Sequence, residues 1–240
     1  CIRDRNTAVE AGFTDFQSVR VMKPSAAFLE HTDSSSGIGN RLGKFILASG
    51  LIWIILACLA QGVIKDGIGL WGPTMIQDIY GVDAGTASFL LLFIPVMNFM
   101  GITLVGMIQR KRLLKEETLV VIMMVLSVFI LAGLRVFMGK SLAAGVLLLG
   151  GVSAVMYGVN TILLGVFPLR FARANRASFV SGLLDFCSYV AAGLSSVFSG
   201  LVIQLGLGWN SVFLVWLVLT VMGVGALGVF GWKYNRRQLQ

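Results

Sequence analysis

Six blocks of apolar residues, each 17 to 26 residues long, restrict the fold of this chain more than any other feature. The blocks lie at residues 45–64, 86–108, 118–134, 142–167, 178–203 and 211–232. A helix of about 20 apolar residues crosses a hydrocarbon core of about 30 Å. A helix also satisfies its backbone hydrogen bonds within one segment, whereas a barrel needs short strands of alternating polarity. The sequence therefore predicts an all-α membrane protein with six transmembrane helices.

The composition excludes a water-soluble domain. Hydrophobic residues make up 57% of the 240 residues and charged residues only 12%, whereas an ordinary soluble domain is about 25% charged. The net charge of +8 would suggest nucleic acid as the partner of a soluble protein. No polar segment here has a basic stripe with interleaved aromatic residues, so we expect the lipid bilayer, and not nucleic acid, as partner.

The distribution of lysine and arginine predicts the orientation in the membrane, because these residues resist translocation and mark cytoplasmic loops. Twelve of them lie beside the blocks on one predicted side: Arg41, Lys44, Arg110, Lys111, Arg112, Lys115, Arg170, Arg173, Arg176, Lys233, Arg236 and Arg237. The opposite loops contain two, Arg135 and Lys140. We therefore expect both termini in the cytoplasm.

The polar tail at residues 1–43 differs from the rest of the chain. It has balanced charges and a serine-rich end, which is typical of a flexible cytoplasmic linker. Residues 44–240 would then form the six-helix domain. Because the chain opens with Cys1 and not with an initiator Met, we expect it to be a fragment. Its three cysteines form no disulfide framework, and Cys58 and Cys187 lie inside apolar blocks as packing residues.

The residue types argue against an enzyme. His31 is the only histidine and lies in the tail, which leaves nothing for a Ser–His protease or a His-ligated metal within the membrane. Gly67, Gly69 and Gly72 match the spacing of a dinucleotide-binding loop, but they follow an apolar helix and not a strand. We expect no catalytic activity, cofactor or metal.

Three charged residues lie at membrane depth or near it: Lys65, Asp66 and Asp185. A charge at the bilayer centre costs about 2.5–3.5 kcal/mol, so such residues usually face water or a partner. Two structural alternatives stay open: Lys65 could extend to the outer interface, and Asp185 could be hydrated or paired with a nearby arginine. Since Lys65 and Asp66 are consecutive, we expect their side chains to point in different directions.

Polar and small residues mark the fourth and fifth blocks. Tyr157, Asn160 and Tyr189 lie well inside them, which suggests either a cavity lining or interfacial tyrosines. Small residues recur every four positions at Gly150, Ala154, Gly158 and at Ala192, Ser196, Gly200. Such spacing lets helix backbones approach closely, either in static packing or in the sliding contact of a transporter.

Several motifs together suggest a family. The stretch Lys65-Asp-Gly-Ile-Gly-Leu-Trp-Gly-Pro-Thr74, the Met156-Tyr-Gly158 triplet and Ser181-Gly-Leu-Leu-Asp-Phe-Cys-Ser-Tyr189 resemble the seventh, tenth and eleventh helices of organophosphate:phosphate antiporters. Gly106 with the basic Arg110–Arg112 loop is similar to a cytoplasmic loop of the wider superfamily. From about Phe45 onward, the chain resembles the C-terminal half of a major facilitator superfamily transporter.

The resemblance implies a function and a site. It implies two six-helix halves around a central site, with the N-terminal half missing here, in a bacterial inner membrane. The substrate would be a small organic anion exchanged for phosphate. Lys65 would replace the family's substrate-binding arginine, with Tyr157, Asn160, Asp185 and Tyr189 around the substrate. Asp66 replaces the family's tyrosine and would repel an anion if it faced the site.

Three other functions are compatible with the same residues. The first is a carrier of a sugar or carboxylate coupled to protons through Asp66 or Asp185. The second is a nutrient receptor built on a transporter scaffold, which would bind its ligand with little flux. The third is a self-contained six-helix protein that pairs with a second copy of itself.

Overall fold

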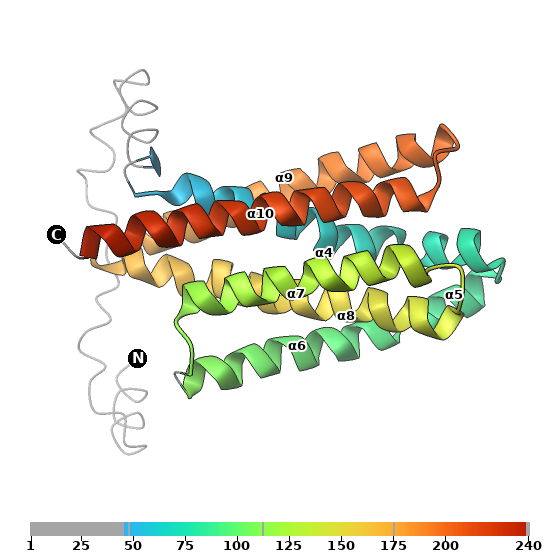
Figure 1. The fold of residues 1–240 in the computed structure, drawn as a ribbon, viewed down its shortest axis with the longest axis horizontal. Helices are drawn as coiled ribbons and strands as arrows, with labels where there is room; N and C mark the ends of the chain where they lie inside the picture. Colours follow the sequence, from blue (N-terminus) through green and yellow to red (C-terminus); the bar gives the residue numbers. More distant parts are fainter. Residues whose placement is uncertain (1–45, 48, 112, 175, 239–240) are drawn as a thin grey trace, which may run out of the picture. The chain divides into compact units, whose positions relative to one another are not determined.

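The computed structural model describes residues 46–47, 49–111, 113–174 and 176–238, so the predicted linker at 1–43 lies outside the described residues. All elements described are helical (Figure 1). In chain order they are α4 (Leu51–Tyr80), α5 (Ala84–Leu91), α6 (Phe93–Arg110), α7 (Glu116–Phe137), α8 (Leu142–Asn160), η2 (Thr161–Val166), η3 (Phe167–Ala174), α9 (Ala177–Gln204) and α10 (Trp209–Gln238).

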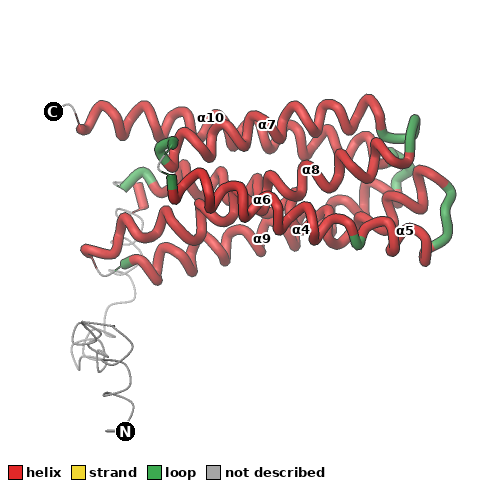
Figure 2. The backbone as a smooth tube through the Cα atoms, turned by 90° about the horizontal axis from the view of Figure 1, so that it is seen from below, coloured by secondary structure: helices red, strands yellow, loops and turns green. Residues whose placement is uncertain are grey.

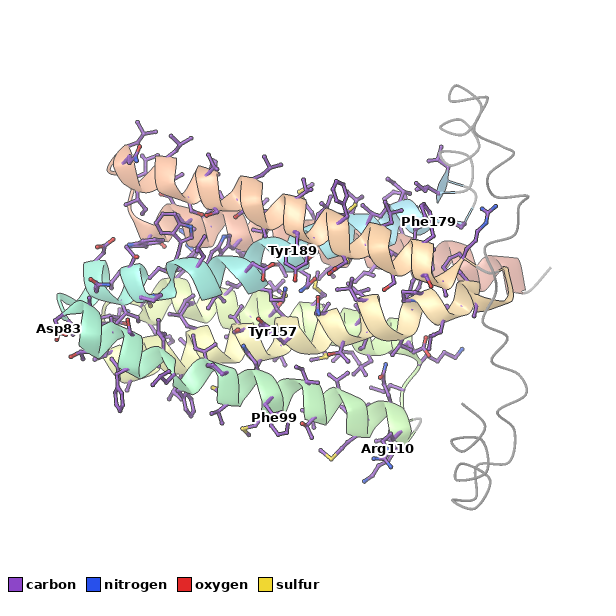
Figure 3. The ribbon with its side chains drawn as sticks, turned by 180° about the vertical axis from the view of Figure 1, so that it is seen from behind. Asp83, Phe99, Arg110, Tyr157, Phe179 and Tyr189 are labelled. Atoms are coloured by element: carbon purple, nitrogen blue, oxygen red, sulfur yellow. The ribbon has the colours of Figure 1, made fainter. Side chains whose placement is uncertain are left out.

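Six spans among these residues are long and apolar enough to cross a membrane: Leu51–Tyr80, Ala84–Arg110, Glu116–Phe137, Leu142–Ala172, Ala177–Gln204 and Trp209–Gly231. The predicted all-helical, multi-pass membrane protein is confirmed at this level. Figure 2 shows the spans running side by side with their connections at the two ends. Arg110 and Asp83 lie at opposite ends (Figure 3).

The first span is longer than the sequence analysis predicted. We expected it to end at residue 64, where the apolar block ends. Helix α4 instead continues to Tyr80 and includes Pro73. Gly67 lies where a Cβ atom would stand 2.7 Å from the ring of Trp216 on α10, so its lack of a side chain permits close packing and does not break the helix. The helix ends at Gly81, whose left-handed φ of 66° allows its N–H to donate to Gln77.

Two other spans change geometry along their length. The second is divided at Leu92 into α5 and α6. Pro95 has no N–H to donate to the carbonyl of Leu91, which accounts for the break. In the fourth span, the α-helical geometry ends at Asn160, and the chain continues as the π-helix η2 and the 3₁₀ helix η3 to Ala174. This span therefore extends beyond the predicted end at residue 167.

The helices pack in a pattern that repeats after three spans. Helix α4 packs against α9 and α10, while α8 packs against α6 and α7. The remaining main pairs are α4 with α8 and α7 with α10. If the first, second and third spans are exchanged with the fourth, fifth and sixth, the same six pairings result. Because successive spans alternate in direction, α4 and α8 run in opposite directions, so the repeat is inverted (Figure 1).

The small-residue stripes are places of close helix packing. A Cβ atom at Gly101 on α6 would overlap the carbonyl oxygen of Ala154 on α8. Gly150 lies under Met97 of α6, where a Cβ would stand 2.7 Å from the sulfur. On α9, Ser196 accepts a hydrogen bond of 3.2 Å from the indole N–H of Trp71 on α4. Such close approach is what small residues provide in a bilayer, where hydrophobic driving force between helices is absent.

Hydrogen bonds and ion pairs connect the spans at both ends. At the Asp83 end, Trp209 donates to Asp78 over 2.9 Å, and Arg135 donates to Asn210 over 3.0 Å. At the other end, Arg170 of η3 forms ion pairs with Glu116 and Glu117 at the start of α7. The described basic residues of the predicted cytoplasmic loops share the Arg110 end.

Asp83 caps α5 and gives a pH-dependent prediction. Its carboxylate accepts hydrogen bonds from the Thr86 N–H and hydroxyl, at 2.9 and 2.6 Å, and these bonds lower its pKa below the usual value of 3.8. A lowered folded-state pKa contributes stability above the unfolded value, and this contribution is lost as pH falls through the folded pKa. Asp83→Ala should therefore lower the Tm slightly at neutral pH and have no effect at a pH below that pKa. Asp83→Asn, which still caps, is the control; an equal Tm loss for Asp83→Ala at both pH values would contradict the assignment.

Candidate functional site

Lys65 lies near the middle of the 30-residue helix α4, which packs against α8, α9 and α10. Its side chain is only 9% exposed. The predicted alternative, in which Lys65 extends to the outer interface, is wrong: the span ends fifteen residues later, at Tyr80, and the ammonium stays at the level of its own turn. Lys65 is therefore a cation at mid-depth of the helical bundle.

The ammonium of Lys65 forms an ion pair with the next residue. The distance from its Nζ atom to Oδ1 of Asp66 is 2.9 Å. We expected these side chains to diverge, because consecutive helix positions are about 100° apart. The flexible four-carbon stem of lysine bends across this angle, which corrects the expectation. The second carboxylate oxygen of Asp66, Oδ2, is buried and has no hydrogen-bond partner among the described residues.

Two tyrosine rings from two further helices flank the ammonium. Nζ of Lys65 lies 5.4 Å from the ring centroid of Tyr157 on α8 and 5.4 Å from that of Tyr189 on α9. Figure 3 shows both tyrosines near the middle of the spans, between Asp83 and Arg110. A cation over an aromatic face gains about 0.5–2 kcal/mol. The predicted site residues Lys65, Tyr157 and Tyr189 are thus brought together from three helices.

An amide pair adjoins this group on the same face of α4. Nε2 of Gln61 donates to Oδ1 of Asn160 on α8 over 3.2 Å, and Gln61 itself is fully buried. Asn160 was predicted as a site residue from the sequence, whereas Gln61 was not. Its position four residues before Lys65, on the same helix face, was the signal that could have found it. Oε1 of Gln61 has no hydrogen-bond partner among the described residues. We call Gln61, Lys65, Asp66, Tyr157, Asn160 and Tyr189 the Lys65 cluster.

Asp185 lies apart from the ion pair. It is exposed on α9, one turn before Tyr189, and takes part in none of the ion pairs among the described residues. The glycines at 182 and 193 lie on the same exposed stripe, and a Cβ at either would meet no atom within 4 Å. This stripe of α9 is polar or small at membrane depth, unlike the apolar stripe of Ile122, Leu126 and Phe129 exposed on α7.

The geometry of the Lys65 cluster suits anion binding. It contains one buried cation, two phenol groups and an amide pair, with a carboxylate as the resting counter-ion of Lys65. The described residues contain no group of three or more His, Cys, Asp or Glu side chains that could hold a metal ion. The ammonium is a competent point charge for a phosphate or carboxylate. Neither models of protein families, nor curated proteins, nor solved structures gave a match to this chain in our comparisons.

Proposed function

We propose that this chain is the C-terminal half of a major facilitator superfamily transporter of small organic anions. The transport reaction is exchange of an organophosphate for phosphate by alternating access, in a bacterial inner membrane. The observation that carries this proposal is the position of Lys65. Its ammonium is buried at the middle of α4 and flanked by tyrosines from α8 and α9. A lysine at this depth is costly, and charged residues inside membrane spans commonly mark substrate or ion pathways.

The helix arrangement supports the transporter proposal. Inverted repeats of three helices within each six-helix half are a feature of this superfamily, and substrate sites lie near the membrane midplane where the repeats meet. In this chain α4 and α8 are the first helices of the two repeats, and they pack against each other. Lys65 and Tyr157 lie at matching places near the middle of the first and fourth spans, Leu51–Tyr80 and Leu142–Ala172. The Lys65 cluster is therefore where a substrate is expected.

The exposed polar stripe of α9 supports a second half. Asp185 and the 60%-exposed Tyr189 would be costly against lipid tails. Glycine in a helix costs roughly 0.5–1 kcal/mol relative to alanine, and those at 182 and 193 gain no close contact within the described residues. We infer that this stripe faces a water-filled pathway between this domain and an upstream six-helix half.

The substrate class follows from the chemistry of Lys65. An ammonium attracts anions as a point charge, without the bidentate geometry that arginine offers phosphate. Asp66 neutralises Lys65 at rest, so a dianion such as a phosphate ester competes for the ammonium better than a monoanion does. The amide pair of Gln61 and Asn160 can exchange its internal hydrogen bond for bonds to substrate hydroxyl groups.

A proton-coupled carrier is the second candidate, and the Lys65–Asp66 pair favours it, because a carboxylate at membrane depth can take up a proton. A nutrient receptor or a self-paired six-helix protein has no such specific support.

Exchange of labelled phosphate by the full-length protein in proteoliposomes tests the proposal. We expect uptake that requires phosphate inside the vesicles and that a sugar phosphate inhibits. Uptake that needs no internal phosphate and is abolished by a protonophore would instead support the proton-coupled carrier. Binding of phosphate with no flux in either assay would support a receptor, and the absence of both binding and flux would contradict the anion site.

A further inference from the structure

The Lys65–Asp66 ion pair sets a condition on anion binding, if the proposed function holds. Lys65 is the one described lysine or arginine in the cluster, and its ammonium already contacts Oδ1 of Asp66 at 2.9 Å. An anion that binds Lys65 must displace this carboxylate or share the ammonium with it. Either outcome places two negative charges around one positive charge at membrane depth.

Displacement would leave the Asp66 carboxylate without a partner. Its Oδ2 atom is already buried and unpaired among the described residues, so Lys65 is the one group among them that compensates the charge. Removing one partner of a buried ion pair is strongly unfavourable, because it leaves the other charge uncompensated. A bound proton removes that cost, since a protonated carboxyl is neutral and can donate through its O–H.

The titratable groups on α4 and on the helices that pack against it include no other described cation. On α4 itself the titratable neighbours are Lys65 and Cys58. Helix α8 contributes Tyr157, and α9 contributes Asp185, Cys187 and Tyr189. The described side chains of α10 and α5 include no titratable group. None of these neighbours besides Lys65 can neutralise a carboxylate, so the proton must come from water.

We infer that Asp66 is a proton-coupling residue: when an anion binds Lys65, the Asp66 carboxylate takes up one proton from the aqueous side that is open. The proton adds to a carboxylate oxygen, Lys65 stays protonated, and no other bond changes. When the anion leaves on the opposite side, the proton leaves as well and the ion pair forms again. Each anion carried through the site is then accompanied by one proton, whether the cycle runs as exchange or as net uptake.

The test measures protons taken up on binding of inorganic phosphate. Purified full-length protein in weakly buffered detergent solution is titrated with phosphate at a pH where phosphate is a dianion, and a pH indicator records the proton change. Phosphate affinity is measured in parallel by equilibrium dialysis. The variants are Asp66→Asn, which keeps the volume but cannot titrate, and Asp66→Glu, which keeps a carboxyl group. Asp83→Asn is the matched control, because it removes a carboxylate outside the Lys65 cluster, at the start of α5.

The expected result is about one proton per bound phosphate for the wild type, for Asp66→Glu and for Asp83→Asn. Asp66→Asn should take up no proton and should bind phosphate roughly tenfold or more tightly, because no carboxylate competes for Lys65. Equal proton uptake by the wild type and Asp66→Asn would overturn the inference and leave the anion site intact, since the proton would then reside on the phosphate or elsewhere. Absence of phosphate binding by a folded wild type would remove the proposed function and the inference with it.

Discussion

Replacing Lys65 by alanine should abolish phosphate exchange and also destabilise the domain. Hydrogen bonds to charged groups contribute about 1.5–3 kcal/mol, which corresponds to roughly 10- to 150-fold in anion affinity. The same change removes the one ion-pair partner that Asp66 has among the described residues. The side chain of Asp66 is only 28% exposed. Breaking a buried pair costs about 3–5 kcal/mol of unfolding free energy. Because Asp66 is partly exposed, we expect a loss near the lower end of this range. Phosphate binding and thermal unfolding in detergent measure the two effects.

A double variant separates the two effects. Lys65→Met with Asp66→Asn removes both charges while roughly keeping the side-chain volumes, so the stability lost in Lys65→Ala should return. Phosphate exchange should not return, because no cation remains in the Lys65 cluster. Lys140→Met, at the Asp83 end of the spans, removes an exposed lysine and should leave exchange unchanged. Exchange at the wild-type rate by the double variant would exclude Lys65 from the substrate site.

Gly101→Ala on α6 should destabilise the contact between α6 and α8 strongly. The added methyl would overlap the backbone carbonyl of Ala154, which cannot move aside as a flexible side-chain end can. The two helices would have to separate, and Ala154 lies one turn before Tyr157 on α8. Overpacking of this kind costs about 1–3 kcal/mol. The separation should also weaken phosphate binding by displacing Tyr157 from Lys65.

Gly106→Ala on the same helix is the matched control. A Cβ at Gly106 meets no atom within 4 Å, so only the helix propensity changes, in favour of alanine by up to about 1 kcal/mol. Because both variants gain the same helix propensity, they should differ by the overpacking cost, about 1–3 kcal/mol in unfolding free energy, measured by denaturation from mixed micelles. Similar stabilities for Gly101→Ala and Gly106→Ala would show that α6 and α8 are not in this close contact.

The lengths of the apolar blocks predicted the number and type of the elements, because each crossing of a bilayer needs one helix of about this length. The end of the first span could not be predicted in this way. Gly67 and Pro73 favour a helix end in water, yet α4 includes both. The ring of Trp216 occupies the space that a side chain at Gly67 would need, and this contact comes from α10, far along the chain. The contact with α10 thus accompanies a continuous helix at a position where residue propensities alone favour a helix end.

Most residues of the Lys65 cluster were singled out from the sequence, but Gln61 and the contacts within the cluster were not. A lysine or tyrosine within an apolar block is visible in the sequence because its burial is costly. The pairing of Lys65 with Asp66 depends on a side-chain conformation that packing selects, and the helix positions alone suggested the opposite. Gln61 was missed because a single amide is a weak signal until its partner Asn160, ninety-nine residues away, is placed beside it.

The most direct measurement of the central claim asks whether the Lys65 cluster faces water. In a background with Cys1, Cys58 and Cys187 replaced by serine or alanine, Tyr189→Cys is treated in proteoliposomes with a charged thiol reagent that does not cross membranes. The control is Phe129→Cys, which replaces a 70%-exposed residue on the apolar stripe of α7.

We predict that Tyr189→Cys reacts with the charged reagent, that phosphate or a sugar phosphate slows the reaction, and that Phe129→Cys does not react. Reaction of Tyr189→Cys only with an uncharged, membrane-permeable reagent would contradict the account. That result would place Tyr189 against lipid and would make the Lys65–Asp66 pair a structural element without access to an aqueous substrate.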